Sequence, residues 1–378
     1  MSDAHLTTEE LRTSVREFLE AEGGLEAVRR ATSAAGFGFE PLWAKVAELG
    51  WLGLGIEEHH GGLGLGLASV GVLCEELGRA LTPLPLGPTL LAAVALRVAG
   101  SAAQQAARLP PIAAGARRAS VALPGAEPLP ALDRSGRVRG RVACIVDADR
   151  VDDLFLPVRD AGGSVCLAIL AADLAGVRVE PRPAIDLTRT LADVVLEDAY
   201  VAPEALLALD TRRWGALIDR AAVLIASDAV GGATHILERT VTYLGSRVQF
   251  ERPIGSFQAL KHRAATWKIL VESVSALTRH AATLVDAGGA EGAATASAAK
   301  FSACDAYIQV AGDAVQLHGG IGFTWDHECH LFLKRAHLDA VLHGRSRQHR
   351  ERHAALAFGD RYQAHPEHCF LQAPPSPP

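Results

Sequence analysis

The sequence predicts an α+β fold with three successive domains: a helical domain, a small antiparallel β-domain and a four-helix domain. Over residues 1–118 and again over 206–360, apolar residues recur at steps of three and four, the period of amphipathic helices. Residues 119–205 instead carry short apolar runs separated by glycine, proline and aspartate, which is typical of antiparallel strands. Residues 361–378 are rich in proline, and we expect them to form a tail outside any core.

Length and composition narrow the class of protein. The chain has 378 residues, of which 49% are hydrophobic and 21% charged, and its formal net charge is −6. This size predicts two or three domains, and a weakly acidic chain without a long basic run argues against nucleic acid as the main partner. The polar start and the lack of ~18 successive apolar residues predict neither a signal peptide nor a membrane span. Six cysteines without a C-x-x-C pair indicate reduced thiols and a cytoplasmic protein.

The N-terminal domain begins with a recognisable helix start. Thr7 and Glu10 have the spacing of a capping box, in which each side chain accepts a hydrogen bond from a free backbone N–H. Residues 43–51 form an amphipathic segment, which predicts a helix ending at glycine. The glycine-rich residues 61–66 follow no strand, so we interpret them as a bend before a helix over 67–81 rather than as a dinucleotide loop.

Five apolar runs predict the strands of the β-domain. Each is short and is bounded by residues that favour turns. The runs cover residues 142–146, 154–158, 164–170, 177–179 and 191–196.

The C-terminal domain reads as an up-and-down helical bundle. One stripe of apolar residues, spaced by three and four, marks the buried face of a long helix. The stripe consists of Leu260, Ala264, Trp267, Val271, Val274 and Leu277.

Two breaks in this domain carry candidate binding residues. Pro253 and Gly255 are expected to end one helix, and Gln258 to begin the next. Around this break lie Arg247, Phe250 and Gln258, a cation, an aromatic ring and an amide beside a helix N-terminus. That set suits a phosphate and a flat heterocycle, although an ordinary turn with a surface arginine has the same composition.

The second break begins at Gln316 and continues through Gly319 and Gly320. Adjacent glycines let a ligand approach the backbone, but alone they also fit a helix C-cap. Together the two breaks place an arginine, a phenylalanine three residues later and a glutamine eight residues after that, followed downstream by Gln-x-x-Gly-Gly-x-Gly. This combination, with the order of the three domains, resembles the acyl-CoA dehydrogenase family over roughly residues 7–358.

The resemblance implies an FAD enzyme that desaturates an acyl-CoA thioester and passes electrons to an electron-transfer flavoprotein or a similar acceptor. In such enzymes the β-domain of one subunit holds the flavin ring, and the C-terminal domain of its neighbour holds the ADP half. The residues of this chain that match the neighbour's contacts are Arg247, Phe250, Gln258, Gln316, Gly319 and Gly320.

The chain departs from the family where chemistry is expected. A glutamate of a Tyr-Glu-Gly-Thr motif usually removes the α-proton, and His343 stands in its place here. A second group of members carries the glutamate on an earlier helix, at a position that falls near Ala221, with Asp219 about half a turn away. Residues 121–130 match the flavin-binding loop but hold no serine or threonine hydroxyl.

This asymmetry predicts a subunit of a heteromeric enzyme. The chain offers the ADP-side contacts to a neighbour, while a homologous partner, in an α2β2 assembly, supplies the base and the flavin-ring contacts. Heteromeric members of this kind act in steroid breakdown, so a steroid-CoA is one expected substrate. Two alternatives remain: a homo-oligomeric flavoenzyme with His343 or Asp219 as base, and a non-catalytic scaffold that binds acyl-CoA.

No metal site is expected from the sequence. His349 and His353 have the i, i+4 spacing of a helical metal site, but two arginines lie between them. His327 and His330, with a cysteine between them, lack a matching pair elsewhere.

Overall fold

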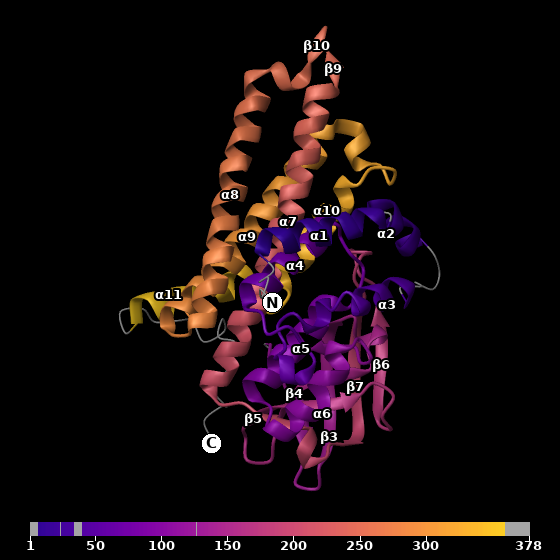
Figure 1. Cartoon of the computed structure of the whole chain (residues 1–378), viewed down its shortest axis with the longest axis vertical. Helices are drawn as coiled ribbons and strands as arrows, with labels where there is room; N and C mark the ends of the chain where they lie inside the picture. The colour runs from indigo at the N-terminus through magenta and orange to yellow at the C-terminus, as the bar shows by residue number, and fades with distance from the viewer. Residues whose placement is uncertain (1–6, 23, 34–39, 126, 360–378) are drawn as a thin grey trace, which may run out of the picture.

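The computed structural model describes residues 7–22, 24–33, 40–125 and 127–359. The strands of the β-domain lie at one end of the molecule, and the long helices of the C-terminal domain extend to the other end (Figure 1). The first N-terminal helices are drawn between these two parts. The three-part α+β architecture predicted from the sequence is confirmed, and the expected tail lies outside the described residues.

The N-terminal domain is helical, as predicted. The capping box is present, because the Glu10 amide donates to Thr7 Oγ1 at 3.2 Å and the Thr7 amide donates to Glu10 Oε2 at 2.8 Å. The helix expected over 43–51 covers Glu40–Glu48 instead, since Gly50 adopts a left-handed φ of 72° and Trp51 begins a 3-10 turn. The helices are α1 (Thr8–Ala21), α2 (Gly24–Ser33), α3 (Glu40–Glu48), α4 (Leu67–Arg79), α5 (Leu86–Ala99) and α6 (Ala102–Ala113), with turns η1 (Trp51–Gly53) and η2 (Glu58–His60).

The β-domain is one sheet of eight strands. Seven follow the order β6-β7-β3-β2-β4-β5-β8, and β1 pairs with β4. The pairing is antiparallel except that β1 and β2 each run parallel to β4, which the sequence pattern did not predict. The strands are β1 (Ala119–Val121), β2 (Ala131–Leu132), β3 (Arg137–Val146), β4 (Asp153–Arg159), β5 (Val165–Ala171), β6 (Val177–Arg182), β7 (Leu191–Tyr200) and β8 (Leu206–Ala208), with turns η3 (Ala148–Arg150) and η4 (Pro203–Ala205).

The C-terminal domain is a bundle of long helices. Its helices are α7 (Thr211–Ser246), α8 (Gln258–Ala287), α9 (Ala290–His318), α10 (Cys329–Val341) and α11 (Ser346–Phe358). The start of α8 at Gln258 is confirmed, but Pro253 and Gly255 do not end α7, which already stops at Ser246. A short hairpin, β9 (Val248–Gln249) and β10 (Arg252–Pro253), follows because Phe250 and Glu251 adopt left-handed φ angles of 53° and 65°.

Glycines allow α4 and α7 to pack with their backbones in close contact. A Cβ on Gly231 would lie 1.8 Å from the Glu75 carbonyl oxygen, and a Cβ on Gly78 would lie 2.1 Å from the Asp228 carbonyl oxygen. The large core shared by the N-terminal helices and the bundle includes both helices. A separate smaller core fills the sheet.

Two general properties follow from the coordinates. Among the described residues, no helix combines the length and apolar character needed to cross a membrane. The five described cysteines are free thiols, and Cys74, Cys304 and Cys329 are buried, as expected for reduced core thiols.

Candidate active site and cofactor face

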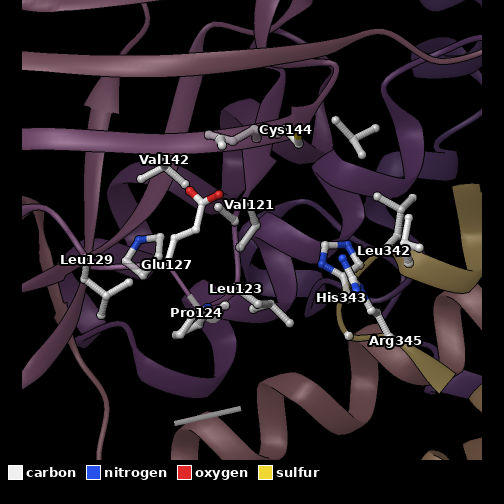
Figure 2. Close-up of a pocket in the computed structure, with 18 of the residues that line it drawn as sticks. Val121, Leu123, Pro124, Glu127, Leu129, Val142, Cys144, Leu342, His343 and Arg345 are labelled. Atoms are coloured by element: carbon white, nitrogen blue, oxygen red, sulfur yellow. The ribbon is translucent and has the colours of Figure 1, made fainter. Parts of the chain in front are cut away.

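A cavity of about 780 Å³ lies between the β-domain and the junction of α10 with α11. One side is formed by the loop after β1 and by the end of β3, and the other by the turn that contains His343 (Figure 2). A cavity of this size can hold a drug-sized ligand. The sequence predicted residues from both sides, and the structure places residues 121–125, 127–130 and His343 around the same cavity.

The wall of this cavity is mostly apolar. None of its described residues is serine, threonine or tyrosine, in agreement with the hydroxyl-free loop seen in the sequence. One carboxylate, Glu127, lies across the cavity from His343 and Arg345 (Figure 2). The sequence analysis missed Glu127 as a candidate, because only its position in the matched loop could have indicated it.

His343 occupies a strained turn. Its φ is 51° and that of Gly344 is 107°, so two successive residues adopt left-handed backbone angles. The His343 carbonyl faces His349 Nε2 at 3.1 Å, and the Gly344 carbonyl accepts from Lys300 Nζ at 2.9 Å. Burial, followed by the positive charge of Lys300, lowers the pKa of His343 to about 4. The imidazole is therefore neutral at pH 7 and has a low affinity for a proton.

A smaller chamber of about 40 Å³ lies behind His343. Ala221, the position at which some family members carry their base, lines it together with His343, Asp228 and Asp339. Asp219 lines neither space, because its carboxylate pairs with Arg352 at 2.6 Å.

Buried charges form the floor of this chamber. The Arg335 guanidinium is fully buried and contacts Asp186 at 2.8 Å, Asp228 at 3.2 Å and the Thr188 hydroxyl. Asp339 is also buried, and one of its carboxylate oxygens has no hydrogen-bond partner among the described residues. Burial and the neighbouring Asp228 raise the pKa of Asp339 well above its usual value, which favours the protonated form.

The predicted cofactor contacts lie far from the cavity, at the opposite end of the bundle. We call the six residues Arg247, Phe250, Gln258, Gln316, Gly319 and Gly320 the distal face. All six are exposed, and the Phe250 ring is 85% exposed. The side chains of Arg247, Gln258 and Gln316 make no hydrogen bond or ion pair with any described residue.

A stacked ring pair joins the two segments of the distal face. The Tyr243 ring lies on His318 with centroids 4.4 Å apart, and its hydroxyl donates to the His318 carbonyl at 3.4 Å. Tyr243 lies one turn before Arg247, and His318 immediately precedes Gly319. The structure therefore brings together the two breaks that the sequence analysis combined.

Apolar side chains surround the distal face and are exposed. Phe323 and Trp325 are 84% and 70% exposed and lie in the segment between α9 and α10. Val248 in the hairpin and Ile321 in the turn η6 (Gly319–Phe323) are also exposed. Monomeric proteins seldom expose such a concentration of large apolar groups, so this end of the bundle has the character of a protein interface.

Comparison with known proteins identifies the family. The model described as the acyl-CoA dehydrogenase C-terminal domain matches residues 214–357, and the N-terminal domain model matches residues 6–116. Acyl-CoA dehydrogenase IpdE2 of Mycolicibacterium smegmatis is 34% identical over 356 residues, which cover 92% of this chain and 98% of the relative. The chain belongs to the acyl-CoA dehydrogenase family, whose members are FAD-containing oxidoreductases that act on CH–CH bonds.

Solved structures agree with this assignment over nearly the whole chain. The structure of Tcur3481-Tcur3483, described as a steroid ACAD, has a TM-score of 0.86 at 28% identity, and the match covers 94% of this chain and 99% of that one. The ChsE4-ChsE5 complex from Mycobacterium tuberculosis gives a TM-score of 0.86 at 26% identity, with coverage of 94% and 98%. Both are assemblies named for two different chains.

The two halves of a flavin site fit FAD unequally here. On the distal face, a free guanidinium, a free amide and an exposed ring fit the phosphates and the adenine. In the cavity, the described wall offers no hydroxyl donor to the polar edge of a flavin ring, and its polar side chains include Arg345, Arg347 and Gln348. The described wall therefore lacks the hydroxyl contacts to a flavin ring that the family resemblance implies.

Proposed function

We propose that this chain is a subunit of a heteromeric FAD-dependent acyl-CoA dehydrogenase. It contributes the ADP-side contacts of a shared FAD through Arg247, Phe250, Gln258, Gln316, Gly319 and Gly320. A homologous partner chain, in an α2β2 assembly, supplies the flavin-ring contacts and the catalytic base. The observation that carries the proposal is the position of the distal face: its polar side chains are exposed and without partners, at the end of the bundle opposite the chain's own cavity.

The chemistry of the distal face supports this role. Arg247 is an extended residue directly after α7, with its backbone held by Tyr243, so its guanidinium projects from a fixed base. A guanidinium bonded to a phosphate forms a charge-assisted pair, which is about twice as strong as a neutral hydrogen bond. The exposed apolar side chains around it would be covered by the same partner that supplies the rest of the site.

The chemistry of the cavity supports the assignment of the base to the partner. When bound, FAD supplies the hydride acceptor of the reaction. In the family a glutamate usually removes the proton, and here the position carries His343, a neutral imidazole whose pKa is lowered to about 4 by burial and by the charge of Lys300. The raised pKa of Asp339 favours its protonated form and Asp219 is paired with Arg352, so Glu127 is the one carboxylate among the described residues that line the cavity.

The substrate class follows from the family and its relatives. An acyl-CoA thioester is the substrate that the family implies, with an electron-transfer flavoprotein or similar acceptor receiving the electrons. A steroid-CoA is the specific candidate, supported by the 28% identity and full-length match to a structure described as a steroid ACAD.

One observation favours a second candidate, a homo-oligomeric flavoenzyme. The cavity of about 780 Å³ is retained, and His343 and Glu127 face each other across it. In that case His343 would be the base and the chain alone would be yellow and active. A non-catalytic acyl-CoA-binding scaffold would instead take up no flavin with any partner.

The flavin content of purified protein separates these functions. The chain is purified alone and after co-expression with a homologous acyl-CoA dehydrogenase chain, and bound flavin is measured by absorbance and by release on denaturation. We expect a colourless chain alone and a yellow, active complex with one FAD per pair. A yellow, active homo-oligomer would refute the heteromeric function.

Arg247→Ala tests the shared site directly. In the complex we expect FAD retention to fall about tenfold or more, since a charge-assisted bond contributes about 1.5–3 kcal/mol. The matched control is Arg212→Ala, an exposed arginine at the opposite end of α7, about 50 Å away along the helix. Equal flavin content in the two variants would contradict the cross-chain contact.

A further inference from the structure

Three potential metal ligands converge beneath the distal face. His318 is the last residue of α9, Cys329 is the first residue of α10, and His327 lies in the segment between these helices. One ring nitrogen of each histidine and the cysteine sulfur all lie within 4.8 Å of one another. His318 and Cys329 are buried, and His327 is half-buried. The sequence showed no pair to complement His327; the structure supplies His318 from the preceding helix.

The hydrogen bonds of this cluster indicate which lone pairs a cation would use. His318 Nδ1 lies 2.8 Å from the Ala314 carbonyl and 3.4 Å from Cys329 Sγ. With the Nδ1 proton directed at that carbonyl, the Nε2 lone pair of His318 is left for coordination. A backbone carbonyl in this position is the usual second partner of a metal-bound histidine. The Cys329 amide donates to His327 Nδ1 at 3.3 Å, and a cation bound at this nitrogen would replace that hydrogen bond.

Two neighbouring side chains are held outside the cluster. The nearby Glu328 carboxylate is occupied by Arg239 at 2.7 Å and is not a free ligand. His330 is turned toward the Trp325 carbonyl, at 3.4 Å, and lies outside the cluster.

We propose that His318, His327 and Cys329 form a binding site for Zn²⁺, with water as the fourth ligand. Two imidazoles and a thiolate are ligands that Zn²⁺ prefers, and three protein ligands with one open position are a common zinc arrangement. Bond lengths of about 2.0–2.3 Å place the ligand atoms of a tetrahedral site about 3.5 Å apart. The three ligand atoms now lie within 4.8 Å of one another, so they would have to approach by about 1 Å to form the site.

Binding exchanges a proton for the metal. The Cys329 S–H bond breaks, a zinc–sulfur bond forms, and the proton passes to solvent. The thiolate is the form that binds the metal, so the metal must displace this proton. The apparent affinity for Zn²⁺ should therefore rise with pH.

The expected consequence is a fixed connection between α9 and α10. The ligands flank the segment that carries Gly319, Gly320, Phe323 and Trp325, so an ion bound to His318 on one side and to His327 and Cys329 on the other would hold that segment at both ends. The ion would lie directly below the Tyr243–His318 ring pair. This structural role is independent of where FAD binds.

Metal titration of the full chain, purified without a histidine tag and treated with a chelator, tests the site. We expect one equivalent of Co²⁺ to bind with a thiolate-to-metal charge-transfer band and to be displaced by Zn²⁺. Binding should also change the fluorescence of Trp325, as judged by comparison with Trp325→Phe. A wild-type chain that shows no charge-transfer band, or needs a large excess of metal, overturns the proposal.

Matched variants separate this site from adventitious binding. Cys329→Ser and His327→Gln should each weaken Zn²⁺ binding at least tenfold, and Cys329→Ser should abolish the charge-transfer band. Cys304→Ser, another buried cysteine, and His330→Gln, a histidine one residue from the site, should leave binding unchanged. Because His327 is only half-buried, its variant should fold even if Cys329→Ser does not; unchanged binding in His327→Gln overturns the proposal.

Discussion

Replacing Arg335 by methionine should be among the most damaging single changes in this chain. The guanidinium is fully buried and joins Asp186, in the loop between β6 and β7, to Asp228 on α7. Methionine fills a similar volume but leaves two buried carboxylates without this partner. Removing one member of a buried ion pair costs about 3–5 kcal/mol. Arg189, 3.6 Å from Asp228, offsets part of the loss, so we expect about 3–4 kcal/mol.

Denaturant unfolding of wild type and variant measures this loss. The matched control is Arg350→Met, which removes an exposed ion pair with Asp305 and should cost less than about 1 kcal/mol. Equal losses in the two variants would refute this reasoning.

Three further predictions concern the same core. Asp339→Asn should be at least as stable as wild type at pH 7. Because the folded-state pKa of Asp339 is raised, its contribution to the free energy of unfolding is full below the pKa of the unfolded chain and is lost as pH rises. The advantage of the variant should therefore vanish near pH 4, as measured by thermal unfolding. Gly231→Ala should destabilise the chain by about 2–3 kcal/mol, because its Cβ would overlap the Glu75 carbonyl oxygen, whereas Gly245→Ala, on the same helix in open space, should be neutral or stabilising by up to about 1 kcal/mol in urea unfolding. Burial and then the charge of Lys300 lower the pKa of His349 to about 3, so the contribution of His349 to the free energy of unfolding is full above pH 6.5 and is lost as pH falls toward 3. His349→Gln should therefore weaken the loss of stability in acid. An unchanged dependence of stability on pH would count against this role of His349.

Local sequence patterns predicted most of the fold. The capping box at Thr7, the apolar runs of the sheet and the start of α8 at Gln258 depend on residues close together in the chain, and all three are present. The end of α7 was misplaced because a proline shows only where a helix cannot continue. The hairpin that ends the helix earlier depends on left-handed angles at Phe250 and Glu251, two residue types that seldom adopt them.

The candidate site was predictable only in part. The spacing of Arg247, Phe250 and Gln258 is a local property, so the sequence could single them out as a set. The environment of His343 is not: its lowered pKa arises from burial and from Lys300, which lies on a different helix. Glu127 likewise became a candidate only when the fold placed it opposite His343.

By itself the sequence determined the order of the domains and the kinds of residue at the two breaks, because these depend on periodicity and on turn chemistry along the chain. The motifs at the two breaks also carried the resemblance to the family. The tertiary structure alone decided which distant groups meet. Arg335 reaches Asp186 across 149 residues, and His318 meets His327 and Cys329 only because α9 and α10 lie together at the distal end. Burial and charge act through space, so the protonation of Asp339 and the proposed zinc ligands follow from helix packing rather than from spacing.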